Sequence, residues 1–86
     1  MDINQLIAIV KKKLERGIQI EKILIEDKSF LHKKHTGNQL NKFHLKISIK
    51  SNELKKMNKL DSNKKIYKIL SEELKNTIHS LQILIN

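Results

Sequence analysis

The sequence feature that most constrains the fold is an alternation of apolar and polar side chains over residues 42–51. The apolar members are Phe43, Leu45, Ile47 and Ile49, and they alternate with His44, Lys46, Ser48 and Lys50. Successive side chains of a strand point to opposite faces, so this stretch predicts a strand with one buried and one exposed face. We expect its apolar face to turn toward helices supplied by the rest of the chain.

An amphipathic helix is predicted over residues 2–16. Its apolar stripe, at helical spacing, consists of Ile3, Leu6, Ile7, Val10 and Leu14. Asp2 is placed to cap this helix, and Gln5 stands three residues later in the capping-box position. Gly17 is a natural helix stop.

A second long helix is predicted over residues 63–75, after a cap at Asp61 and Ser62. Its apolar face consists of Ile66, Ile69, Leu70 and Leu74. Before it, residues 52–60 predict a helical turn on the core, with Leu54, Met57 and Leu60 at threefold spacing. Asn76 is expected to end the long helix.

Two further strands are predicted, over residues 19–26 and 78–84, and a flexible polar loop over residues 28–40. The element order is therefore α-β-β-α-α-β. The first two strands should pair antiparallel, because the chain returns directly from one to the next.

The chain has 86 residues, no cysteine and a formal net charge of +9. A chain of this length forms one domain with a thin core, expected here over residues 1–86. Without cysteine it can form neither a disulfide nor a thiolate metal site of its own. No apolar run approaches the roughly 18 residues that span a membrane, and no signal-peptide pattern opens the chain. We expect a soluble, cytoplasmic protein, with an organelle as the alternative.

The positive charge is compatible with a nucleic-acid or acidic partner. However, lysines lie on every predicted element, as a composition rich in Lys, Ile and Asn produces by itself. A nucleic-acid contact would require lysines gathered on one face. The candidates lie around the third helix in chain order, predicted over residues 63–75, and are Lys55, Lys56, Lys59, Lys64 and Lys65.

His79 falls at the junction of the last helix and the last strand. Counting by two along that strand places it on the face of Leu81 and Ile83, at the rim of the core. There it is either a structural histidine bonded to a backbone carbonyl or a residue with a chemical role. No Ser-His-Asp or Cys-His pattern, phosphate loop or apolar carboxylate pair is present, so we do not expect an enzyme.

Four segments together resemble the BolA family over about residues 3–83. The stretch from Asp27 to His35 is similar to the family's D-x-S-x-x-H-x-G-H loop, and His44 to Ser51 to its H-F-K-V-x-V-V-S strand. Two later segments match as well: Lys65-Ile66-Tyr67 with Leu70 and Glu73 resembles the helix after its R-H-R motif, and Ile78-His79-Ser80-Leu81 its I-H-A-L signature. Each segment alone is a weak signal, but four in the right order are a strong one.

The chain departs from the family pattern at several positions. Lys34 replaces the loop glycine, Leu45 replaces the aromatic of the H-F pair, and the usual glycine after the second strand is missing. Residues 62–64 (Ser-Asn-Lys) stand where the family has R-H-R. In the family that basic helix start is linked to DNA contact, so its loss argues against specific DNA binding.

The resemblance implies an α+β fold similar to class II KH domains: a three-stranded sheet with helices packed on one face. The chain has no G-x-x-G, the nucleic-acid clamp of true KH modules. The resemblance further implies an interaction protein that shares a labile [2Fe-2S] cluster with a monothiol glutaredoxin, in iron–sulfur trafficking or iron regulation. The alternative is a nucleic-acid-binding transcriptional regulator that uses the basic surface.

Histidine can replace cysteine as a ligand of a [2Fe-2S] cluster, as in Rieske centres. The resemblance implies that the glutaredoxin supplies its cysteine and a bound glutathione thiolate, and that this chain supplies His79 and a loop histidine. His32 fits the S-x-x-H spacing from Ser29, and His35 is the alternative. His44 is expected to be a surface residue. Alone, the chain should bind no cluster and be a monomer or a weak homodimer.

Overall fold

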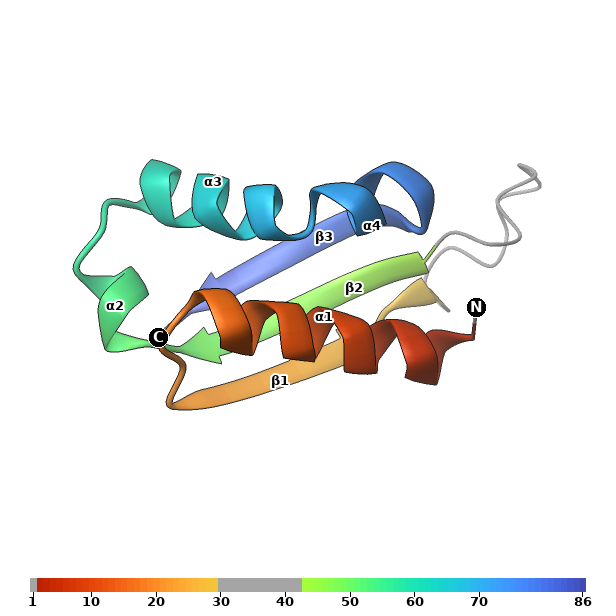
Figure 1. The fold of residues 1–86 in the computed structure, drawn as a ribbon, viewed down its shortest axis with the longest axis horizontal. Helices are drawn as coiled ribbons and strands as arrows, with labels where there is room; N and C mark the ends of the chain where they lie inside the picture. The colour runs from red at the N-terminus through yellow and green to blue at the C-terminus, as the bar shows by residue number, and fades with distance from the viewer. Residues whose placement is uncertain (1, 30–42) are drawn as a thin grey trace.

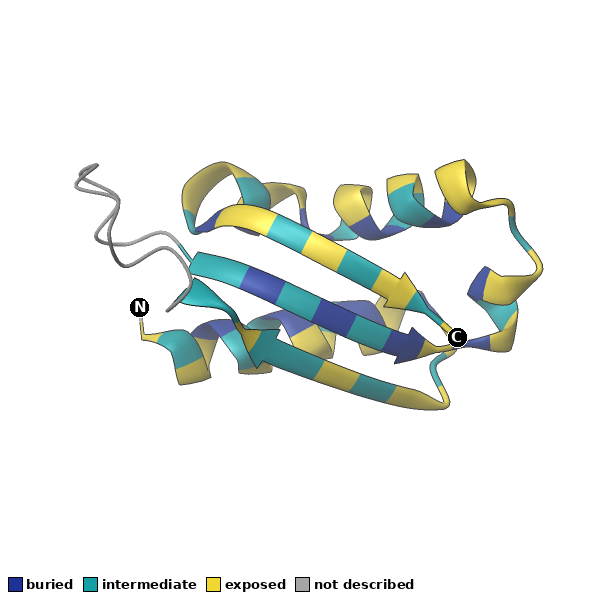
Figure 2. Cartoon of the chain, turned by 180° about the vertical axis from the view of Figure 1, so that it is seen from behind, coloured by how far each residue is buried: buried dark blue, intermediate teal, exposed yellow. Residues whose placement is uncertain are grey.

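A computed structural model of the chain describes residues 2–29 and 43–86 (Figure 1). The elements, in chain order, are α1 (Ile3–Gly17), β1 (Lys22–Asp27), β2 (Phe43–Lys50), α2 (Asn52–Lys55), α3 (Lys59–Ile69), α4 (Ser71–Asn76) and β3 (Ile78–Ile85). Figure 1 shows α1 and α3 across one face of the sheet. Figure 2 shows the opposite face, over which no described helix passes. The predicted α+β architecture is confirmed.

The sheet has the order β1-β2-β3, with β2 in the centre. β1 and β2 pair antiparallel, with Ile25 opposite Ile47, as the direct return of the chain predicts. β2 and β3 pair parallel, with Ile47 opposite Ile83. A parallel pair needs a crossover between its strands, and α2, α3 and α4 form that crossover.

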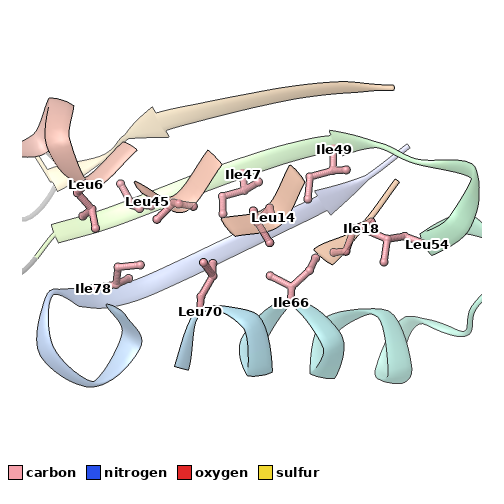
Figure 3. Close-up of a cluster of buried hydrophobic side chains, with 11 residues drawn as sticks. Leu6, Leu14, Ile18, Leu45, Ile47, Ile49, Leu54, Ile66, Leu70 and Ile78 are labelled. Atoms are coloured by element: carbon pink, nitrogen blue, oxygen red, sulfur yellow. The ribbon is translucent and has the colours of Figure 1, made fainter. Parts of the chain in front are cut away.

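One core of buried apolar side chains fills the space between the sheet and the helices (Figure 3). Its members are Leu6, Val10, Leu14, Ile18, Leu45, Ile47, Ile49, Leu54, Ile66, Leu70 and Ile78. The predicted apolar faces of α1 and β2 thus supply most of the core, with Ile3 and Phe43 only partly buried against it. No helix in the described ranges has the length and apolarity needed to cross a bilayer.

The start of α1 is fixed by the predicted capping box. The Gln5 backbone N–H donates to Asp2 Oδ1 at 2.8 Å, and the Asp2 backbone N–H donates to Gln5 Oε1 at 3.0 Å. The helix ends at Gly17, and Ile18 continues in an extended conformation. A Cβ at Gly17 would lie 2.8 Å from Ile69 Cδ1, so the glycine also permits close approach to α3.

A buried carboxylate connects α1 to α4. Lys13 Nζ donates to Glu73 Oε2 at 2.6 Å, and the Glu73 side chain is almost fully buried. This hydrogen bond is the main reason why the pKa of Lys13 is raised above its usual value. The ion pair compensates a charge that burial would otherwise make costly.

The predicted start of the second long helix is wrong. α3 begins at Lys59, and its cap is Asn58, whose Oδ1 accepts from the Asp61 backbone N–H at 2.7 Å. Asparagine caps helices as well as aspartate does, so the earlier residue takes the role. Ser62 lies inside the helix, where its hydroxyl donates to the Lys59 carbonyl at 3.0 Å. The helical segment is also divided, because Leu70 separates α3 from α4.

The position of Leu60 and the start of β1 also differ from the prediction. Leu60 does not pack on the core: it lies in the first turn of α3 and its side chain is 64% exposed. β1 starts at Lys22 rather than at residue 19, because the Gln19 backbone N–H donates to a carboxylate oxygen of Glu53 instead of joining the sheet.

Ser51 connects the end of β2 to α2 and to the segment before β1. It is fully buried, and its hydroxyl donates to the Gln19 carbonyl at 2.7 Å. The same oxygen accepts from the Leu54 backbone N–H at 3.2 Å, so Ser51 is the N-cap of α2. One buried hydroxyl therefore satisfies two backbone groups.

We predict that Ser51→Ala destabilises the protein by about 1–3 kcal/mol, because it leaves a buried carbonyl and an N–H unpaired. Thermal unfolding followed by circular dichroism should show a fall in Tm of about 4–8 °C per kcal/mol. Ser48→Ala, on the open face of β2, is the matched control and should leave Tm nearly unchanged. Equal Tm values for the two variants would contradict the role given to Ser51.

Candidate functional site

His79 lies on a β-bulge at the start of β3. Phe43 pairs with Ile78 and His44 pairs with Ser80, so His79 is an extra residue opposite the step between Phe43 and His44. Ile78 is buried in the core, whereas His79 is exposed. The prediction that His79 shares the inward face of the strand is therefore wrong. An inserted residue shifts the alternation of side chains, and counting by two cannot detect it.

The bulge brings His79 against His44. The two imidazole rings meet edge to face, with centroids 4.9 Å apart and an interplanar angle of 71°. Nδ1 of His44 lies 2.6 Å from the Ser80 hydroxyl, which orients the ring. The structure thus joins two histidines that are 35 positions apart in the sequence. His44 is half-buried within this cluster rather than an isolated surface residue.

The backbone of His44 also holds the segment that follows β1. Its N–H donates to Ser29 Oγ at 3.1 Å, and its carbonyl accepts from the Lys28 N–H at 2.7 Å. Ser29 therefore lies beside the histidine pair. His32 and His35, the predicted loop ligands, lie outside the described residues, and their approach to His79 stays a prediction.

This arrangement can supply imidazole ligands but cannot complete a metal site. The chain has no cysteine, and the described ranges contain no group of three His, Asp or Glu side chains suited to a metal ion. A [2Fe-2S] cluster takes four ligands, and imidazole can replace thiolate on one iron. His79 and a second histidine fit the two imidazole positions on one iron, provided that another molecule supplies the thiolates.

The pattern of apolar and polar side chains gave no sign that His44 belongs to the site. Its alternation with Leu45 correctly indicates the open face of β2. Its contact with His79 depends on the parallel register between β2 and β3, which is set by pairing across the sheet. The resemblance of residues 44–51 to a family strand was the one available signal.

The candidate nucleic-acid residues lie at the other end of the sheet, where α2 leads into α3 (Figure 1). Lys55, Lys56, Lys59 and Lys64 are exposed. Lys65 differs, because its ammonium group pairs with a carboxylate oxygen of Glu53. One of the five predicted lysines, Lys65, is thus already engaged in an ion pair within the fold.

Glu53 stabilises this end of the molecule through two partners. Its carboxylate accepts from the Gln19 backbone N–H at 3.0 Å and pairs with Lys65. The backbone hydrogen bond, and secondly the ion pair, lower the pKa of Glu53 below its usual value. The ionised Glu53 carboxylate therefore stabilises the fold at pH values above the pKa that it has in the unfolded chain. This stabilisation is lost as the pH falls through the lower pKa that it has in the folded protein.

We predict that Glu53→Gln lowers stability at neutral pH, because Lys65 loses its charged partner. The difference from wild type should begin to shrink as the pH falls below the ordinary glutamate value of about 4.5. It should disappear once the pH has fallen through the lowered folded-state pKa, where the wild-type carboxylate also becomes neutral. Urea unfolding at several pH values between neutral and acid would measure this difference. Glu15→Gln, on the exposed side of α1, controls for the loss of one negative charge. A difference between Glu53→Gln and wild type that stays constant across the range would contradict the prediction.

The fold and the site define a class: a small α+β domain with a three-stranded sheet, helices on one face, and histidines at the start of the parallel strand pair. The sequence matches the family described as BolA-like protein over residues 14–86. The chain belongs to the BolA family, as its motifs suggested.

Individual relatives agree with this assignment. The chain is 32% identical over 75 residues to a Haemophilus influenzae protein named DNA-binding transcriptional regulator BolA, covering 87% of this chain and 70% of the relative. Among solved structures it is similar to BolA1 from Arabidopsis thaliana (TM-score 0.76, 27% identity, 92% of this chain and 87% of that one). The BolA domain of SufE1 from the same plant shares the fold, with a TM-score of 0.78, 24% identity, and coverage of 100% and 93%.

Proposed function

We propose that this protein is a non-catalytic partner of a monothiol glutaredoxin, with which it shares a labile [2Fe-2S] cluster for iron–sulfur trafficking or iron regulation. The observation that carries the proposal is the exposed His79, held against His44 in a chain that has no cysteine. The cluster is the cargo of the complex.

The division of ligands follows from the chemistry of the two chains. The glutaredoxin contributes its cysteine and the thiolate of bound glutathione, which this chain cannot offer. This chain contributes His79 and a second imidazole. His44 is in contact with His79, so it joins His32 and His35 as a candidate for that second ligand.

The surroundings of His79 suit a ligand better than a structural residue. Its side chain is exposed, and its backbone lies at the start of a pair of parallel strands. The Ser80 hydroxyl on Nδ1 of His44 orients the neighbouring ring, as partners of metal-binding histidines commonly do. Replacing an exposed histidine removes little buried surface, so ligand loss and unfolding can be separated by experiment.

We predict that His79→Ala stays folded, with a Tm within a few degrees of wild type, yet loses the histidine-ligated spectrum of the shared cluster. The measurement is a visible circular-dichroism titration of each variant with a cluster-loaded monothiol glutaredoxin under anaerobic, reducing conditions. His44→Ala, His32→Ala and His35→Ala, measured in parallel, identify the second ligand as the variant that also changes the spectrum.

Two controls sharpen this experiment. The isolated wild-type protein should remain colourless after attempted reconstitution, because imidazoles alone cannot hold the iron pair. Ser80→Ala should keep the cluster but shift its spectrum, if the hydroxyl orients His44. A wild-type spectrum and affinity from His79→Ala would remove His79 as a ligand, and the proposed function with it.

A second candidate function is nucleic-acid binding. It is favoured by the name of the Haemophilus influenzae relative, a DNA-binding transcriptional regulator, and by the exposed lysines around α2 and α3. The replacement of R-H-R by residues 62–64 counts against sequence-specific contacts, and Ser62 is buried.

We predict that any affinity for duplex DNA is independent of sequence and falls steeply with salt, because lysine contacts with phosphate act through counterion release. Fluorescence anisotropy with two unrelated duplexes, at about 50 and 200 mM salt, measures both properties. Tight, salt-resistant preference for one duplex would favour the regulator instead.

A further inference from the structure

A groove runs along the free edge of β3, at the opposite end of the sheet from His79. It encloses about 330 Å³ between the last residues of β3 and the segment from α2 to α3. Its apolar floor includes Ile83 and Ile85 from β3 and Leu54 and Met57 from the α2 region. Leu54 is buried in the core, so the groove is an extension of the core to the surface.

The edge of β3 along this groove presents unpaired backbone groups. Among the described strands, β3 pairs with β2 on one side and with none on the other. The Asn86 N–H donates to the Ile49 carbonyl at 2.8 Å, on the β2 side. In a parallel ladder, alternate residues turn their N–H and C=O groups to opposite sides, so those of Ile83 and Ile85 face away from β2. No hydrogen bond from another element of the described chain reaches them.

β3 lacks the features that normally protect an edge strand. Its eight residues, Ile78–Ile85, include no charged residue and no proline. β1, at the other edge, carries Lys22, Glu26 and Asp27. Charged residues and proline are the usual means by which edge strands avoid pairing with another chain, and their absence leaves β3 open to a further strand.

The positive charge around the groove favours an acidic strand. Lys55 and Lys59 line it, and no carboxylate does. The chain as a whole has a net charge of +9. Asn63 also lines the groove, and its buried Oδ1 has no hydrogen-bond partner within the described part of the chain.

We propose that this groove binds an extended, acidic segment of a partner protein, which adds to the sheet as a fourth strand beside β3. The backbone of the segment pairs with Ile83 and Ile85, an apolar side chain fills the space over Leu54, and acidic side chains meet Lys55 and Lys59. This site is independent of the histidine pair, and it gives the protein a second interaction surface.

Other occupants fit these observations less well. A second copy of the chain would bring two +9 molecules together, with Lys55 and Lys59 of each facing the same sign of charge. A single-stranded nucleic acid would need aromatic side chains on which its bases stack, and the lining residues of the groove include none.

The test uses the full chain and a fluorescein-labelled peptide, Glu-Val-Glu-Ile-Glu-Val-Glu. Anisotropy gives the affinity at about 150 mM salt, where long-range charge effects are screened. Amide NMR shifts locate the site, which should lie at residues 83–86 and 54–63. The double variant Lys55→Glu with Lys59→Glu should weaken binding by about tenfold or more, as expected for the loss of close charge pairs. The matched control, Lys11→Glu with Lys12→Glu on the exposed side of α1, should bind nearly as wild type does.

A peptide of the same sequence with alternate N–H groups methylated separates strand addition from charge attraction. It should lose binding, because it cannot pair with the edge of β3. Equal binding of the methylated peptide, equal weakening by both double variants, or no binding at all would overturn the proposal. So would amide shifts in this groove caused by oligothymidine but not by the peptide, or by self-association of the chain.

Discussion

The structure depends on the burial of one face of β2. Its apolar residues Leu45, Ile47 and Ile49 are at most 2% exposed, and this requires a strand on each side and helices in front. The same alternation leaves His44, Lys46 and Ser48 on the open face. One strand thus provides both the centre of the core and the base of the candidate site. His44 of the histidine pair therefore stands on the central strand of the sheet, and His79 on the edge strand beside it.

Local patterns were sufficient for the parts of the fold that local interactions determine. The capping box of α1 and the buried face of β2 lie within short windows of sequence, and both are confirmed. The start of α3 was missed because Asn58 and Asp61 are both good caps, and sequence does not rank them. Leu60 was misplaced as a consequence of that choice.

The candidate site could be predicted only in part, because it is formed by pairing between distant strands. The family motif singled out His79 as a candidate residue, whereas its exposure follows from the bulge. The bulge reflects a mismatch of one residue in the pairing of β2 with β3. Neither strand shows this mismatch in its own sequence. The contact between His44 and His79 follows from the same register. In a strand without a bulge, side-chain patterns report which face a residue occupies, but they do not report its neighbours on the next strand.

The parallel pairing of β2 and β3 has a consequence for the order of folding. β1 and β2 can meet by a direct return of the chain, whereas β3 can pair with β2 only after α2, α3 and α4 have bridged the distance between them. Contacts between residues far apart in sequence form slowly, because the entropy of closing the intervening chain is lost before they contribute. We therefore expect β3 to be the last strand to join, so that its uncharged, largely apolar sequence is exposed to other chains until then. The net charge of +9 should oppose association of two such chains during that interval, because like-charged molecules repel.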